Sequence, residues 1–499
     1  MKKLVSVLLA LIMALSLFSA ALADDAPTVS VFLHIANTGF SNDLIFKTVE
    51  EKFGIKFEWI ASQYHELIPN LNKYYAADNL PDFFLSIEGC TSTLFRNMIE
   101  ENMVTDLTPY LESGKYPNLV RYLTETDPSF EHEIIDGKWY GIPRYYEPKY
   151  PQSLYYRADL LEKLGLEAPK TVEELADVIE KVVAADPDGN GIQGMFFYLK
   201  EYAWLCQPFT GTVSWLKYED TGKIEEYFVR PEYRDFLIYV NNLWKKGLID
   251  PDMVANVEAA HIEKFAAGQV FCTWNNFDAN LYNPYYNTLL ESYPDAVVKI
   301  LDPITGPAGT YVNSKEQGYD GCMAISSKVP PETVEKILAM CDWVVSDEGR
   351  ETAMYGLEGV HYKVVDGQKV RIEEGFEADK ANVSNIWALG VHRVNQLVES
   401  YFSHGPLPTV DRYDELVGYY DAIHAGTPAK VTWLHQFTSQ NKVDFEAGVK
   451  DCVAEYLTKF IIGTLDPNSD ADWDTYLKAL DQAGYYLIEA DVNEWMKDK

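Results

Sequence analysis

The segment from residue 28 to residue 86 alternates between strand-like and helix-like patterns, and this order restricts the fold more than any other feature. Val29, Val31 and Leu33 fall on one side of a predicted strand. A helical pattern over 41–53 ends at Gly54, and a strand pattern over 55–60, a helical pattern over 64–77 and a strand pattern over 80–86 follow. Strands separated by helices are typical of a parallel sheet, so we predict an α/β fold.

Polar residues follow two of these predicted strands. Asn37 and Thr38 come after the first strand, and Ser86 and Glu88 come at and just after the end of the third. Ligands of open α/β sheets bind beyond the carboxyl ends of the strands. We therefore predict ligand contacts at Asn37, Ser86 and Glu88, with ordinary loop polarity as the alternative.

The N-terminus has the pattern of a secretory signal. Lys2 and Lys3 precede an apolar run from Leu4 to Phe18 and the small-residue site at 21–23, so we predict a leader over 1–23. The first cysteine is Cys90, so no cysteine is available for lipid attachment at the processed end. We expect an exported protein that is secreted, periplasmic or held at the outer face of the membrane, without stable insertion into it.

The chain that remains is long and strongly acidic. Its 476 residues exceed what one core usually organises, so two or more domains are expected. Loss of the two leader lysines changes the formal net charge from −34 to −36, which repels phosphate backbones and excludes a nucleic-acid partner. Oligomeric state is not encoded in these features, and a monomer is the default.

Two proline-rich segments mark predicted passages between domains. The first, 141–148, places two prolines around an aromatic pair, and the second, 302–307, contains two prolines and a glycine. Helices with apolar stripes follow each passage, one capped by Thr171 and one that begins near Pro331. We assign 24–145 and 302–358 to a first lobe, and 146–301 and 359–499, helix-rich in its last part, to a second.

The common catalytic signatures are absent. The sequence contains no GxSxG, HExxH, Walker A or dinucleotide fingerprint, and no CxxC. The six cysteines lie far apart within apolar segments such as 321–325, so buried thiols are expected although disulfides are permitted. A glycosidase needs only a pair of carboxylates, and the 76 acidic residues leave that alternative open.

One run has part of a calcium-loop pattern. Asp186, Asp188 and Asn190 place oxygen ligands at positions 1, 3 and 5, and Gly191 occupies position 6. Position 12 is Phe197, so the acid that completes such a loop is missing. A plain turn is favoured over a calcium site, and no other cofactor is expected.

Tryptophans lie beside polar residues at several points in the chain. A sugar offers hydroxyls and an apolar ring face, so its site combines aromatic rings with hydrogen-bonding side chains. Core packing is the alternative for any single tryptophan. The complete predicted ligand-binding set is Asn37, Ser86, Glu88, Tyr145, Trp204, Trp274, Asn275, Glu358, Tyr362 and Trp387.

Five segments spread over the chain resemble the extracellular solute-binding proteins of family 1, the carbohydrate receptors of ABC importers, and their lipoprotein-like Gram-positive branch. They are 155–165 with 169–171, 265–270 before Trp274, 342–349, 356–362 and 473–484. The resemblance implies a type II periplasmic-binding-protein fold, in which two α/β lobes close on a ligand cleft by hinge motion. It also implies sugar stacking on Trp204 and Trp274 and polar contacts in the loop after Asp82.

These observations favour a binding protein that captures an oligosaccharide and delivers it to ABC transporter permease subunits without catalysis. Stacking on Trp204 and Trp274 would supply affinity, while Asn37, Glu88, Asn275 and Glu358 would orient the ligand. A secreted glycosidase or lyase, and a sensor or peptide receptor of the same fold, are the alternatives. The missing lipid-attachment cysteine and the incomplete Asp186 loop are the departures from the family pattern.

Overall fold

A computed structural model shows two compact units built from alternating stretches of the chain. The residues it describes are 26–34, 44–145, 152–196, 199, 202–255, 260–276, 288–310, 319–365, 367–372, 374–375, 434 and 437–498. Unit 1 is Met1–Tyr146 with Gln317–Gly405, and unit 2 is Glu147–Glu316 with Pro406–Lys499. No helix in these described ranges is long and apolar enough to cross a membrane.

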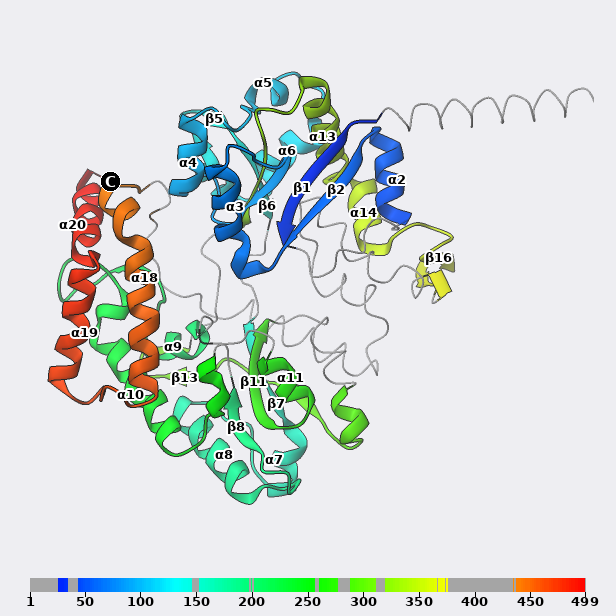
Figure 1. Ribbon diagram of the computed structural model, residues 1–499. Helices are drawn as coiled ribbons and strands as arrows, with labels where there is room; N and C mark the ends of the chain where they lie inside the picture. Colours follow the sequence, from blue (N-terminus) through cyan, green and yellow to red (C-terminus); the bar gives the residue numbers. More distant parts are fainter. Residues whose placement is uncertain are drawn as a thin grey trace, which may run out of the picture. The chain divides into compact units, whose positions relative to one another are not determined.

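Unit 1 is organised around a five-stranded sheet in the order β2-β1-β3-β15-β6 (Figure 1). Its strands are β1 (Thr28–His34), β2 (Lys56–Ser62), β3 (Phe83–Ser86), β6 (Gly141–Tyr145) and β15 (Tyr319–Ile325). Strand β1 pairs in parallel with β2 and β3, whereas β15 is antiparallel to both β3 and β6. The predicted strand–helix alternation and the parallel pairing of the first three strands are therefore confirmed.

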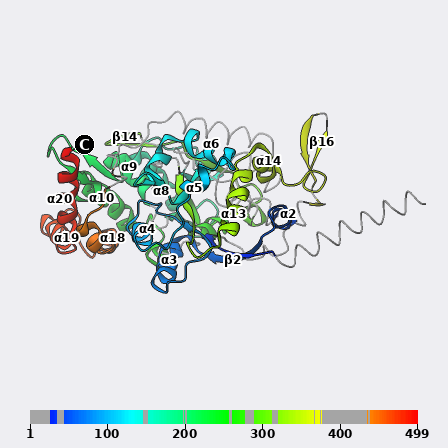
Figure 2. The same ribbon diagram turned by 90° about the horizontal axis from the view of Figure 1, so that it is seen from above.

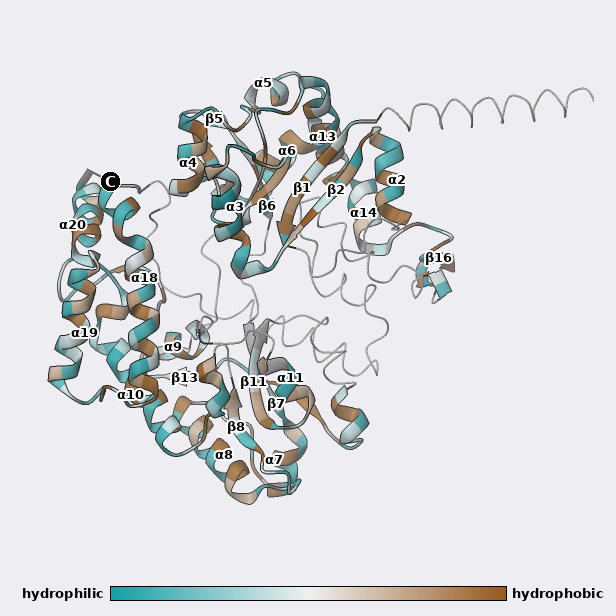
Figure 3. Cartoon of the chain, viewed as in Figure 1, coloured by the Kyte–Doolittle hydropathy of each residue, from teal (hydrophilic) through white to brown (hydrophobic). Residues whose placement is uncertain are grey.

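Amphipathic helices cover this sheet. They are α2 (Leu44–Phe53), α3 (Leu67–Ala76), α4 (Thr93–Glu100), α5 (Thr108–Leu111), α6 (Pro117–Glu125), α13 (Pro331–Val344) and α14 (Asp347–Tyr355), with the 3₁₀ helices η2 (Tyr64–Glu66) and η3 (Pro128–Glu133). Figure 3 shows strand β1 mostly in the hydrophobic colour, while the covering helices carry both colours. The apolar stripe predicted for α13 is buried, since Val334, Ile337 and Leu338 are almost inaccessible to solvent.

Two short hairpins complete unit 1. Strands β4 (Ile134–Ile135) and β5 (Lys138–Trp139) form one, and β16 (Tyr362–Val365) and β17 (Gln368–Arg371) form the other. The predicted helical character after residue 359 is therefore wrong for this second hairpin, in which the β-branched Val364, Val365 and Val370 favour an extended backbone.

Unit 2 contains a second, four-stranded sheet in the order β12-β7-β11-β8. Its strands are β7 (Gln152–Arg157), β8 (Gln193–Phe196), β11 (Val270–Asn276) and β12 (Val298–Ile300), and the helices α7 (Ala158–Leu164), α8 (Val172–Ala185) and α11 (Ala260–Ala266) pack beside it. Strand β11 is parallel to β8 and antiparallel to β7. The predicted cap of α8 is confirmed, because the Thr171 hydroxyl accepts a hydrogen bond from the Glu174 N–H at 3.1 Å.

A helical layer forms the other part of unit 2. Helices α18 (Gln440–Ile461), α19 (Asp470–Gln482) and α20 (Tyr485–Trp495) lie side by side next to α10 (Pro231–Lys245), as both Figure 1 and Figure 2 show. The layer also holds α9 (Ala203–Thr210), β9 (Trp215–Lys217), β10 (Ile224–Glu226), η5 (Tyr227–Val229), η6 (Pro251–Ala255), η8 (Met496–Asp498) and the hairpin β13 (Thr305–Gly306) and β14 (Gly309–Thr310). Buried Asn241 ties α10 to α18 by donating to the carbonyl oxygens of Phe460 and Ile461.

The unit boundaries differ from the predicted ones in the second half of the chain. The first change of unit follows Tyr146, because 141–145 is a strand of unit 1 rather than part of a crossover. The second follows Glu316 instead of residue 301, since the Thr305 N–H donates to the Lys170 carbonyl and thereby holds β13 in unit 2. The third follows Gly405 instead of residue 358, so Tyr362 belongs to unit 1. The predicted leader over 1–23 lies outside the described residues.

Candidate functional site

The carboxyl ends of the parallel strands in unit 1 meet at one edge of its sheet. His34 ends β1 and Ser62 ends β2, and the His34 Nδ1 lies 3.1 Å from the Ser62 carbonyl oxygen. Ser86 ends β3 and is buried, and its hydroxyl donates to the Gly89 carbonyl at 3.2 Å. Glu88 is exposed in the loop that follows, and Asn37 lies outside the described residues. The structure thus brings Ser86 and Glu88 to the predicted edge, with the Ser86 hydroxyl already bonded within its own loop.

The other predicted residues of unit 1 that the structure describes lie on β6, on β16 and in the loop before β16. Tyr145 ends β6, half-buried, and its N–H donates to the Tyr122 hydroxyl at 2.7 Å. Tyr362 begins β16 and donates its hydroxyl to Glu351 at 2.9 Å. Burial and the neighbouring Glu351 carboxylate raise the pKa of Tyr362 to about 12, so this hydroxyl stays protonated at neutral pH. Glu358 is exposed, and Trp387 lies outside the described residues.

The two tryptophans predicted for unit 2 are in direct contact. Trp204 lies in the first turn of α9 and Trp274 lies in β11, and their rings stack with centroids 4.5 Å apart and planes 11° from parallel. Trp204 is 7% exposed and Trp274 is 3% exposed. Each ring therefore packs one face against the other ring, and the rest of its surface is largely buried. Asn275 follows in β11, and its side chain lies outside what the structure describes.

Unit 2 also contains a pocket of about 730 Å³ between α18, α20 and the segment from β9 to η5. Five aromatic side chains contribute to its wall: Tyr202, Trp215, Tyr227, Phe228 and Tyr485. Trp215 stacks on Tyr485 with ring planes 19° apart. Aliphatic residues of α18 and five charged residues also line it, the latter being Glu226, Glu446, Lys450, Asp451 and Glu455. An apolar wall with a small number of polar groups is the usual composition of a small-molecule site.

The tyrosine hydroxyls of this pocket stay protonated at neutral pH and are hydrogen-bonded within the protein. Tyr202 and Tyr227 are hydrogen-bonded to each other, and burial raises the pKa of both side chains above the ordinary tyrosine value. Four carboxylates against one ammonium make the lining acidic. The pocket therefore offers aromatic faces and hydrogen-bonding groups to a ligand but disfavours negative charge on that ligand.

The carboxylates of the Asp186 loop are bound by groups of the protein itself. Asp186 is the C-cap residue of α8 and accepts hydrogen bonds from the N–H groups of Gly191 and Ile192 at 3.0 and 3.2 Å. Asp188 receives Arg157 on one oxygen at 2.8 Å and Lys163 on the other at 2.7 Å. Both oxygens at position 3 of the calcium pattern are thus bound to cationic side chains.

The Asn190 side chain of the same loop is hydrogen-bonded to two other groups of the protein. Its amide nitrogen donates to the Gly268 carbonyl at 3.0 Å and to the Tyr293 hydroxyl at 2.6 Å. Calcium needs six to eight oxygen ligands, with carboxylates supplying the charge. Asp186, Asp188 and Asn190 all make these contacts within the protein, and a calcium ion would have to compete with them.

Sequence reasoning missed most of the pocket. Trp215 and Tyr485 were not among the predicted residues, and the α18 residues Val449, Val453 and Leu457 were not recognised as a wall. One pattern could have indicated them: the apolar residues of 449–457 recur at intervals of four, which predicts a buried face on this helix.

Comparison with known sequences gives a family match and several distant relatives. Residues 39–351 match the family described as bacterial extracellular solute-binding protein. The chain is 24% identical over 478 residues to the polygalacturonan/rhamnogalacturonan-binding protein YtcQ of Bacillus subtilis, covering 91% of this chain and 88% of the relative. It is 22% identical to the fructooligosaccharide ABC transporter substrate-binding protein FusA of Streptococcus pneumoniae, with 88% and 84% covered.

Solved structures agree with this match. The alginate-binding protein AlgQ2, solved without calcium ion, has a TM-score of 0.74 at 19% identity and covers 95% of this chain and 98% of its own. The S. pneumoniae FusA complex with kestose has a TM-score of 0.69 at 19% identity and covers 95% and 100%. The predicted α/β periplasmic-binding-protein fold is confirmed. Because the family model spans well over half of the sequence, this chain belongs to the bacterial extracellular solute-binding protein family.

Proposed function

We propose that this protein binds a neutral oligosaccharide outside the cell and delivers it to the permease of an ABC transporter. The observation that carries the proposal is the match, along about nine-tenths of the chain, to relatives named for binding polygalacturonan or fructooligosaccharide. The aromatic pocket of unit 2 supports it, since ring faces beside charged hydrogen-bonding side chains suit the apolar face and the hydroxyls of a sugar.

The charge of the protein favours a neutral sugar over a uronic acid. The formal net charge is −34, and the charged residues of the pocket lining are four carboxylates and Lys450. A galacturonate chain carries one negative charge per sugar unit, and the negative charge of the protein and of the pocket would repel it. We infer that a fructooligosaccharide or another uncharged chain is preferred, and that export, a monomeric state and the absence of turnover accompany this role.

Thermal unfolding against a ligand panel tests the function. A ligand that binds only the folded state raises its stability by about 2.7 kcal/mol at a hundred times its Kd. We expect uncharged oligosaccharides to raise the Tm of the protein by several degrees, and oligogalacturonides to do so less. Release of reducing ends from a bound oligosaccharide would overturn the proposal in favour of a hydrolase. A larger shift with oligogalacturonides would overturn the preference for neutral sugars alone.

Replacement of Trp215 by alanine tests whether the unit 2 pocket holds the ligand. Trp215 is half-buried on the pocket wall, and loss of a stacking ring is expected to weaken oligosaccharide binding by about 0.5–1.5 kcal/mol. Calorimetric titration measures the change. Trp343→Ala is the matched control, because Trp343 is also half-buried but packs on Phe53 in unit 1. Equal affinities for both variants would place the ligand elsewhere.

We further infer that the Asp186 loop functions without calcium. Because Arg157 and Lys163 already neutralise Asp188, added calcium or a chelator is expected to change the Tm by less than about 1 °C. Asp186→Ala should lower the Tm equally with and without calcium, since Asp186 acts on backbone N–H groups of its own loop. A calcium-dependent rise in Tm that is lost in Asp186→Ala would contradict this inference.

A further inference from the structure

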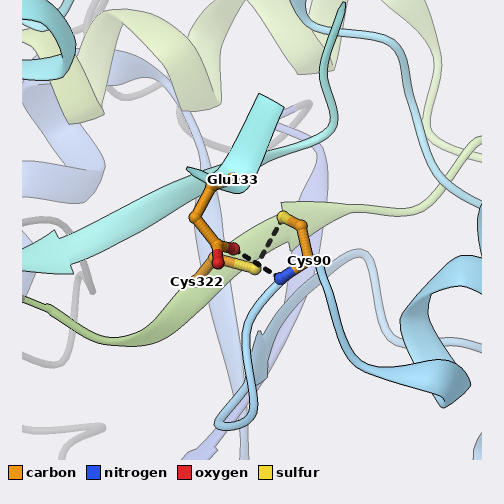
Figure 4. Close-up of side chains that lie close together, drawn as sticks. All are labelled: Cys90, Glu133 and Cys322. Atoms are coloured by element: carbon orange, nitrogen blue, oxygen red, sulfur yellow. Dashed lines mark hydrogen bonds between the residues drawn. The ribbon is translucent and has the colours of Figure 1, made fainter. Parts of the chain in front are cut away.

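Two cysteines and a glutamate lie together in the core of unit 1. The Sγ atoms of Cys90 and Cys322 are 3.1 Å apart, and both residues are completely buried. Glu133, equally buried at the end of η3, accepts a hydrogen bond from the Cys90 N–H. Figure 4 shows the three side chains facing one another from different segments of the unit.

The backbone around the two sulfurs leaves room for them to come into contact. A Cβ atom on Gly141 of β6 would lie 2.6 Å from the Cys90 Sγ and 2.7 Å from the Cys322 Sγ. Gly321 has φ of +73°, and the pairing of β15 with β6 changes register between Tyr319 and Cys322. A bulge of this kind redirects the side chain that follows it. The glycines and the bulge of the sheet therefore hold the two sulfurs in contact.

We propose that Cys90 and Cys322 form a disulfide when the protein folds outside the cell. Two S–H bonds break and one S–S bond forms, while two protons and two electrons pass to a disulfide-bearing oxidant, which leaves as two thiols. An exported thiol oxidoreductase or glutathione disulfide is the class of oxidant that this exchange requires. Formation of the bond needs the two sulfurs to approach by about 1 Å.

The extracellular location of the family supplies the conditions for this reaction. Disulfides form and persist in oxidising compartments. Burial raises the pKa of both thiols, which leaves little thiolate at neutral pH in the folded state. Exchange therefore takes place while the chain is still folding, and the finished bond is shielded from reductants in solution.

The geometry favours a disulfide over a metal site at the same residues. Two thiolates on one tetrahedral zinc ion lie about 3.8 Å apart, since each Zn–S bond is about 2.3 Å. The observed separation is shorter, and the described residues supply three ligand atoms where structural zinc takes four.

The bond would join two parts of unit 1 that are remote in the sequence. Cys90 and Cys322 are 232 residues apart, and most of unit 2 lies between them in the chain. A cross-link over so long a loop removes much conformational freedom from the unfolded chain. It would also fix the loop from Ser86 to Ser92, which carries Glu88, against β15.

Alkylation of the full chain in denaturant, after refolding in a glutathione redox buffer, tests the proposal. Of the six cysteines, four are expected to be labelled before reduction and six after it, with a linked peptide pair containing Cys90 and Cys322. The oxidised protein should melt about 5–15 °C above the same protein refolded with reductant. Six labels before reduction would overturn the proposal.

Two variants provide the controls. Cys341→Ala removes another fully buried thiol, in α13, and should keep a difference of two labels between the unreduced and reduced samples. Cys322→Ala should abolish the difference, and counting in denaturant makes every remaining thiol accessible to the reagent whether or not the variant has folded. One equivalent of tightly bound zinc in the wild-type protein, lost in Cys322→Ala, would overturn the proposal in favour of a metal site.

Discussion

Replacement of Arg157 by methionine is expected to lower the free energy of unfolding by about 3–5 kcal/mol, because it removes the buried cation and leaves only Lys163, which is half exposed, to balance two buried carboxylates. Arg157 is fully buried at the end of β7. Its guanidinium donates to both oxygens of Asp159 at 2.8 and 2.7 Å and to Asp188 at 2.8 Å, and it lies 4.9 Å from the centre of the Tyr293 ring. Urea denaturation measures the loss.

An exposed ion pair in the same unit gives the matched control. Lys246 and Glu180 are 2.6 Å apart, but both side chains are about half exposed. Solvent and salt screen such a pair, so Lys246→Met should have little effect on stability. If the Arg157 and Lys246 variants lost equal stability, the buried network would not have the role that its geometry indicates.

The dependence on pH gives an independent measurement of the same network. Burial would raise the pKa of Asp188, but hydrogen bonds from Lys163 and Arg157 outweigh it and lower the pKa below its ordinary value. A carboxylate with a lowered folded pKa contributes stability above its unfolded pKa of about 3.9, and this is lost as the pH falls. The difference between wild type and Arg157→Met should therefore shrink below about pH 4.

Local patterns in the sequence predict the first half of unit 1 but not the strand that completes its sheet. Strands β1 to β3 and their helices lie in one continuous stretch, so periodicity alone indicates them. Strand β15 comes from residues 319–325 and enters between β3 and β6 after the chain has left unit 1. No local pattern encodes such a return, because the pairing depends on contacts between residues far apart in the sequence.

The residues of the candidate site were likewise predicted only in part from the sequence. Trp204 and Trp274 were predicted to act together, and the structure brings their rings into contact. The prediction could not tell an open platform from a buried pair, because enclosure depends on packing between α9 and β11 rather than on the residues beside each tryptophan. Trp215 and Tyr485 were missed for a related reason, since they meet only when α20 packs near β9.

Replacement of Trp274 by alanine is expected to cost about 3–5 kcal/mol of stability, the usual effect of removing a buried indole and leaving a cavity. Trp274 is 3% exposed and stacks on Trp204, so its removal also exposes one face of the partner ring. Trp274→Phe keeps an aromatic face and should lose less. Urea denaturation of both variants measures the two losses.

A double-mutant cycle with Trp204→Ala separates packing from ligand binding at this pair. The coupling energy between the two rings should be about 0.5–1.5 kcal/mol beyond the effect of buried area, because stacked rings in contact are not independent. Calorimetric titration of Trp274→Phe against an oligosaccharide then tests the platform role. If this variant kept wild-type stability but lost affinity, the indole would contact the ligand. If Trp274→Ala lost neither stability nor affinity, the ring would have neither role, and the burial and stacking of this pair would have been misinterpreted.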